Sequence, residues 1–113
     1  MAPRRVERVA EAIKEAVSLI IQRDVKDPRI GFLTVTGVEL SGDLRYAKIF
    51  ISVYGGRKEK LKSLKGLQSA TRFIRGEIGR KVKLRYTPEI VFKWDESIEK
   101  GAHINDLLHQ ISE

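Results

Sequence analysis

The spacing of apolar residues changes along this chain, and these changes restrict the fold more than any other feature of the sequence. Between Arg5 and Val25, apolar residues recur every three or four positions, which is typical of the buried stripe of a helix. Residues typical of strands occupy Phe32 to Tyr54, helical spacing returns from Leu61 to Ile78, and a further strand-like segment runs from Leu84 to Trp94. The predicted order is helix, strand, strand, helix, helix, strand, which indicates an α+β fold.

The length of 113 residues suits one domain with a single core. We expect residues 1–113 to form that domain, with residues 1–4 and 97–113 as mobile ends and a short helical tail from Ser97 to Ile111. The absence of Cys excludes disulfides, thiolate catalysis and zinc ribbons. Because no apolar run of about 18 residues is present and acidic residues interrupt the first helix, we predict no membrane span and no signal peptide. We expect a cytoplasmic protein.

The first two strands are predicted to form a hairpin. In the segment Phe32–Leu40 the apolar residues move from one face to the other at Gly37, and a β-bulge at this glycine is the simplest way to restore a single apolar face. Residues 41–43 read Ser-Gly-Asp, a turn sequence that leads into Leu44–Tyr54. The core face of this second strand is expected to carry Ala47, Ile49, Ile51 and Val53.

The second helical segment is long for so small a domain, so a kink is expected within it. Its apolar stripe is predicted to start at Leu61, and Gly79 is predicted to end it. The third strand is predicted over Leu84–Trp94, with Pro88 restricting its first part to an edge or entry position and Trp94 in the core. The predicted kink residues are Ala70, Thr71 and Arg72.

The positive charge of the chain is concentrated between Gly55 and Tyr86, where eleven Lys and Arg residues accompany only two acidic residues. Such segregation is typical of a surface that binds a polyanion, and nucleic acid is the leading candidate. A solvated helix face is the alternative, but solvated faces normally mix both signs of charge. One line of residues spaced for a single helix face, here called the basic stripe, consists of Lys58, Lys62, Lys65, Ser69 and Arg72. The further residues predicted to bind RNA are Arg75, Arg80, Lys81, Lys83 and Arg85.

Three aromatic residues share one face of the second predicted strand. Tyr46, Phe50 and Tyr54 are candidates for stacking on unpaired bases, as on RNA-binding sheets. Burial beneath the C-terminal tail, or pairing across the sheet, explains the same pattern. Both interpretations stay open on the sequence alone.

The sequence from Gly76 to Gly79 spells GxxG, the loop that clamps phosphates in KH domains. A clamp there would leave barely one turn for the helix that follows, and Glu77 would oppose a phosphate. The preferred interpretation is therefore that these glycines end a helix.

The sequence offers little support for catalysis. His103 and His109 are six positions apart and do not share a helix face, and Asp95 and Glu96 would point to opposite faces of a strand. No Walker, Rossmann or nucleophile-elbow pattern occurs. We assign no catalytic, cofactor-binding or metal-binding residue.

Three segments carry a resemblance to a known family: DPRIG at residues 27–31, SGDLRYAKIFISV at residues 41–53, and FIR at residues 73–75. With the order of elements, they make the chain similar to bacterial ribosome-binding factor A from Arg4 to about Leu108. The resemblance implies a KH-like fold of type II topology, without a true GxxG loop. It also implies binding to the 30S ribosomal subunit and its 16S rRNA, late maturation of the 16S 5′ end, and a role in cold adaptation. The family's two helices meet at an Ala-x-Gly kink, whereas this chain has Arg72 at the glycine position.

We therefore expect a non-enzymatic ribosome assembly factor that acts as a monomer and needs no cofactor, membrane or small-molecule substrate. One alternative is a general KH-like module that binds RNA or DNA. The other is an rRNA-processing nuclease.

Overall fold

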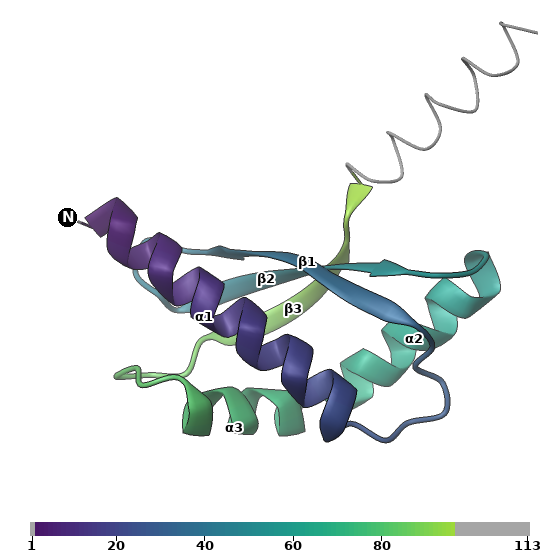
Figure 1. Ribbon diagram of the computed structural model, residues 1–113. Helices are drawn as coiled ribbons and strands as arrows, with labels where there is room; N and C mark the ends of the chain where they lie inside the picture. Colours follow the sequence, from purple (N-terminus) through teal and green to yellow (C-terminus); the bar gives the residue numbers. More distant parts are fainter. Residues whose placement is uncertain (1, 97–113) are drawn as a thin grey trace, which may run out of the picture.

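Three helices cover one face of a three-stranded sheet within residues 2–96, the part of the chain that the computed structural model describes (Figure 1). The elements are α1 (Ala2–Arg23), β1 (Leu33–Leu40), β2 (Tyr46–Val53), α2 (Arg57–Ser69), α3 (Thr71–Lys81) and β3 (Glu89–Trp94). Strand β2 is central, pairing antiparallel with β1 and parallel with β3. The predicted order of elements is confirmed. The predicted tail from Ser97 to Ile111, with His103 and His109, lies outside the described residues.

The core lies between the sheet and the helices. Alternate residues of β2 are buried, and they are the four predicted from the alternation: Ala47, Ile49, Ile51 and Val53. Helix α1 adds the apolar stripe centred on Ile13, Val17 and Ile20, each of which has no exposed surface. The opposite face of the sheet carries exposed side chains such as Tyr46 and Lys48. The hairpin therefore presents one apolar face to the helices and leaves its other face open.

The predicted β-bulge is present at the expected place. Val35 pairs with Ile51 and Gly37 pairs with Phe50, so Thr36 is the extra residue in β1. The bulge brings Leu40 back to the buried face that Val35 occupies on the other side of the irregularity. A local slip in the alternation was sufficient to predict it.

The break between α2 and α3 falls at Ala70, within the predicted kink. The backbone N–H of Ala70 bonds to the carbonyls of Gly66 and Leu67, and helical bonding resumes with Ile74 donating to the Ala70 carbonyl. Gly76 and Gly79 lie inside α3, which continues to Lys81. The prediction that these glycines end the helix is therefore wrong, and they do not form a phosphate-clamping loop either. A Cβ at Gly79 would lie 2.7 Å from the Thr87 Oγ1, so this glycine admits the following loop against the helix.

Two further details differ from the sequence prediction. The third strand begins at Glu89 and not at Leu84, because Pro88 has no N–H and the carbonyls of Thr87 and Pro88 bond to a side chain of α3. Leu61 is 48% exposed, since α2 turns Ser63 and Leu67 toward the core. Trp94 is partly buried against the core, as predicted.

Ser63 joins α2 to the turn that follows α1. Its hydroxyl is fully buried and accepts a hydrogen bond of 3.0 Å from the backbone N–H of Gly31. Gly66, one turn later, lets the Ile30 side chain approach, because a Cβ there would lie 2.6 Å from Ile30 Cγ1. The turn is closed by Asp27, whose carboxylate accepts hydrogen bonds from the Arg29 guanidinium and backbone. These bonds lower the pKa of Asp27 from 3.8 to about 2, so the pair is lost only as the pH falls through this range.

We expect Ser63→Ala to lower the free energy of unfolding by about 1 kcal/mol, because the Gly31 N–H loses its acceptor. Ser69→Ala is the control for removal of a serine hydroxyl, since Ser69 is exposed at the C-terminal end of the same helix. Urea denaturation of the two variants measures the difference. Equal stabilities would show that this hydrogen bond contributes nothing net.

Candidate nucleic-acid interface

The lysines of the basic stripe lie on the solvent side of α2. At about 100° per residue, Lys58, Lys62 and Lys65 fall within about 60° of one another around the helix. All three are exposed, and the buried Leu67 lies on the opposite side of the helix. The spacing predicted from the sequence therefore produces a row of ammonium groups along α2 that is free of core contacts.

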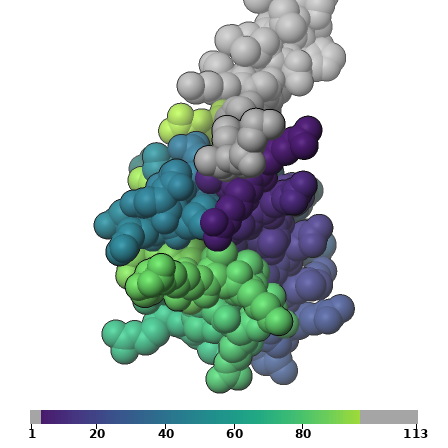
Figure 2. All heavy atoms as spheres, turned by 90° about the vertical axis from the view of Figure 1, so that its left-hand side faces the viewer, coloured from purple at the N-terminus to yellow at the C-terminus, as the bar shows by residue number. Residues whose placement is uncertain are grey.

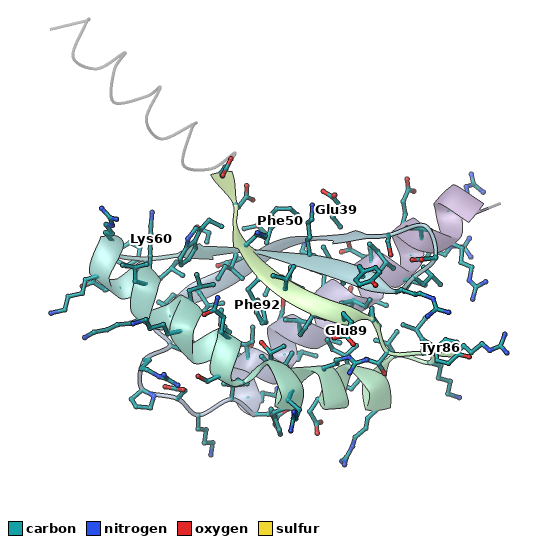
Figure 3. All side chains as sticks on the ribbon, turned by 180° about the vertical axis from the view of Figure 1, so that it is seen from behind. Glu39, Phe50, Lys60, Tyr86, Glu89 and Phe92 are labelled. Carbon is teal, nitrogen blue, oxygen red and sulfur yellow. The ribbon has the colours of Figure 1, made fainter. Side chains whose placement is uncertain are left out.

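The kink connects this row to α3. Arg72, the exposed second residue of α3, lines an open groove together with Gln68 and Ser69 from the end of α2. Tyr86 and Glu89 form the other side of this kink groove, and Figure 3 shows Tyr86 in the loop past the end of α3 and Glu89 at the start of β3. The structure thus brings Arg72 next to the last residue of the stripe on α2.

The predicted cations beyond Arg72 divide into exposed residues and one that is held in place. Arg80 is exposed, with a guanidinium nitrogen 3.9 Å from the carboxylate of Glu77. The other exposed members are Lys81, Lys83 and Arg85.

Arg75 differs from the other predicted cations because its guanidinium is bonded within the protein. It donates hydrogen bonds of 2.9 Å to the carbonyl of Thr87 and 3.1 Å to the carbonyl of Pro88. It also lies 3.2 Å from the carboxylate of Glu89. This arrangement, which we call the Arg75 staple, fixes the approach to β3 and commits Nε and one terminal nitrogen of the guanidinium to contacts within the protein.

The candidate stacking residues lie on β2 and just after its end. Tyr46 and Phe50 project from the face of β2 that the helices leave open, and Tyr46 is 62% exposed. Tyr54, which follows the end of β2, is 85% exposed. Phe50 is only partly exposed. Bases stacked on Tyr46 and Phe50 would therefore lie on the open face of the sheet, whereas Tyr54 lies beside Lys60 near the start of α2.

Sequence reasoning missed a second cationic cluster, which lies around Tyr86. The guanidinium carbons of Arg45 and Arg85 lie 5.5 and 5.7 Å from the centroid of its ring, within the range of cation–π attraction. Arg45 precedes β2 and lies outside the basic stretch of the sequence. Only the parallel pairing of β2 with β3, in which Tyr46 faces Glu89, brings it to Tyr86. No local sequence signal predicts this meeting.

Among residues 2–96 we find no group of three or more His, Cys, Asp or Glu side chains placed to hold a metal ion. No helix in this part of the chain is both long and apolar enough to cross a membrane. Asp43 lines the same pocket as the second cluster, and it accepts hydrogen bonds from the Ser41 hydroxyl and the Arg45 N–H, which lower its pKa.

Arg72 occupies the position where a glycine was expected, and its role can be tested by substitution. If its guanidinium contacts a phosphate, Arg72→Ala should reduce the magnitude of the slope of log K against log salt by about 0.7 to 0.9 and weaken RNA binding several-fold. Arg72→Gly should weaken binding equally and also cost about 1 kcal/mol of stability, since glycine disfavours helix. Binding measured as a function of salt decides this; equal affinities of the three proteins would exclude a contact by Arg72.

The model of the family described as ribosome-binding factor A matches residues 5–108. A ribosome-binding factor A from Natranaerobius thermophilus is 55% identical over 112 residues, which cover 99% of this chain and 86% of that protein. The crystal structure of ribosome-binding factor A from Thermus thermophilus is 26% identical, with a TM-score of 0.69 over 78% of this chain and 93% of that one.

A third similar structure is a homology model of the Thermus thermophilus protein fitted into a cryo-electron microscopy map of a 30S–ribosome-binding factor A complex. It is 27% identical, with a TM-score of 0.67 over 80% of this chain and 97% of that one. These neighbours have a KH-like fold, and the sheet and helices described above share it.

Proposed function

Because the chain belongs to the ribosome-binding factor A family, we propose that it binds the 30S ribosomal subunit and assists the late maturation of 16S rRNA. We include in this proposal the processing of the 16S 5′ end and a role in adaptation to cold. The observation that carries it is the row of exposed lysines on α2 that continues at the kink with Arg72. The similar Thermus thermophilus protein was fitted into the map of a complex with the 30S subunit, which supports the choice of this subunit as the partner.

The basic stripe suits the phosphate backbone of folded RNA. Lysine ammonium groups on a straight helix can follow a phosphate backbone, and each neutralised phosphate releases condensed counterions. Such contacts carry no information about base sequence, so they position the protein and do not specify a site. Specificity for the subunit must then come from the shape of the assembled RNA and from contacts outside the stripe.

We propose that the protein acts by preferring one conformation of the immature subunit. A ligand shifts a folding equilibrium only by the difference in its affinity for the two states. A protein that docks on phosphates brought together in the mature arrangement stabilises that arrangement, and misfolded RNA escapes most slowly in the cold. This mechanism needs no catalytic group. We also propose that the protein acts as a monomer in the cytoplasm, where ribosomes are assembled.

The test compares binding to three partners: immature 30S subunits, mature 30S subunits and free precursor 16S rRNA. Preference for immature subunits over the other two is expected, and equal affinity for all three would favour a general RNA-binding module instead. The same purified protein is then incubated with precursor RNA, with and without Mg²⁺ or Mn²⁺. Stoichiometric binding without new RNA ends is expected, whereas cleavage with multiple turnover would identify a nuclease.

A further inference from the structure

A small pocket at the hairpin end of the molecule is built by three segments that are distant in sequence. Arg5 of α1, the loop between β1 and β2, and the loop between α3 and β3 enclose a volume of about 200 Å³. Figure 2 looks onto this end and shows the purple start of α1, the blue-green hairpin and the bright green loop side by side. We call it the hairpin pocket.

The hairpin pocket combines an apolar base with flat, cationic walls. Leu44 and Leu84 line it and pack against the core behind it. Tyr86 is 59% exposed, and the guanidinium groups of Arg45 and Arg85 lie near its ring. Phenol rings and guanidinium planes are the surfaces on which unpaired bases stack in RNA-binding proteins.

The walls of the hairpin pocket are held in place by backbone hydrogen bonds. The N–H of Arg45 bonds to Ser41 Oγ at 3.2 Å and to Asp43 Oδ1 at 3.1 Å, and its carbonyl accepts the Glu89 N–H at 2.8 Å. On the other side, the Arg75 staple holds the two residues that follow Tyr86. A ligand therefore loses little binding energy to ordering the loops.

The charge of the hairpin pocket favours an anion. Three guanidinium groups, those of Arg5, Arg45 and Arg85, line it together with one carboxylate. That carboxylate, Asp43, is bonded to Ser41 Oγ and to the backbone of its own loop. Guanidinium groups suit phosphate because their N–H donors match its oxygens in pairs.

We propose that the hairpin pocket binds one unpaired nucleotide of RNA, with the base stacked at Tyr86 and the adjoining phosphate held by Arg45 and Arg85. The choice of RNA as the ligand rests on the function proposed above. Tyr86 lines both the hairpin pocket and the kink groove. A single strand leaving the nucleotide can therefore continue past Arg72 onto the basic stripe.

The experiment uses a single-stranded RNA of about eight nucleotides that carries one 2-aminopurine, whose fluorescence responds to stacking. Tyr86→Leu should weaken binding about tenfold and abolish the fluorescence change, whereas Tyr86→Phe, which keeps the ring, should retain both. Arg45→Gln and Arg85→Gln should each reduce the magnitude of the salt slope by about 0.7. Arg23→Gln, an exposed arginine at the far end of α1, is the matched control and should change neither quantity.

Two results would overturn the inference: equal affinity of Tyr86→Leu and wild type, or an unchanged fluorescence response in that variant. Circular dichroism verifies that each variant is folded, which the exposure of Tyr86 and Arg85 favours. Binding to 30S subunits is measured separately with the basic stripe reversed in charge. If the stripe variant loses 30S binding while Tyr86→Leu binds single-stranded RNA normally, the nucleotide site in the hairpin pocket is rejected but the proposed function is not.

Discussion

Replacing Lys58, Lys62, Lys65 and Arg72 together with glutamate should weaken binding to the 30S subunit by at least about a thousandfold. Four phosphate contacts are lost, and four carboxylates are placed against the same backbone. The fold should survive, because all four side chains are exposed and none belongs to the core. Arg75 is left out of the set because the staple gives it a structural role.

A matched control separates local contact from net charge. Replacing Arg4, Arg8, Arg23 and Lys26 with glutamate changes the net charge by the same amount, and these exposed residues lie outside the basic stripe. Co-sedimentation with 30S subunits at one salt concentration compares the two variants after circular dichroism has verified their folds. Affinity of the stripe variant close to that of the control would contradict the assignment of the basic stripe as the docking surface.

The features that the sequence predicted correctly depend on neighbours along the chain. The helix face of α1 follows from the spacing of its apolar residues, and the bulge follows from a slip in alternation at Gly37. The kink at Ala70 was also predicted from the chain itself, because the helical run is long for so small a domain. In α1 and β1 the local structure is the one that buries a single apolar face, and the spacing of apolar residues in the sequence indicates which face is buried.

The features that were missed depend on groups that meet only in the folded chain. Gly79 was interpreted as a helix end, but its role is to admit Thr87, a residue from the following loop. Leu61 was placed in the core because it fits a helical spacing. In the folded chain Leu61 is exposed, and Ser63 and Gly66 are buried on the inner face of α2. Apolar periodicity cannot predict a buried serine or glycine, because each is buried by a contact with one specific residue distant in sequence.

The candidate site shows the same division. The exposed face of α2 was predictable because its lysines share one side of a helix. The roles of Arg75 and Arg45 were not, because their partners are backbone carbonyls and an aromatic ring on the loop before β3. The identity of a charged residue does not tell whether its donors face solvent or the protein's own carbonyls.

The second large expected effect is a loss of stability when the Arg75 staple is removed. Arg75→Ala should lower the free energy of unfolding by about 2 kcal/mol, since it removes two charge-assisted hydrogen bonds to the carbonyls of Thr87 and Pro88. The ion pair with Glu89 adds little to this figure, because the Arg75 and Glu89 side chains are 40% and 66% exposed. Arg75→Lys should recover only part of the loss, as an ammonium group cannot bond both carbonyls in the planar geometry of a guanidinium.

Hydrogen exchange distinguishes a local staple from general destabilisation. The Glu89 N–H, which bonds to the Arg45 carbonyl, should exchange faster in Arg75→Ala by more than the loss of global stability explains, because the loop before β3 is released. Urea denaturation gives the global value, and Arg72→Ala, three residues away on the exposed side of α3, should change stability by less than about 0.5 kcal/mol. If Arg75→Ala is as stable as Arg72→Ala, the guanidinium is free in solution and Arg75 returns to the set of residues that bind RNA.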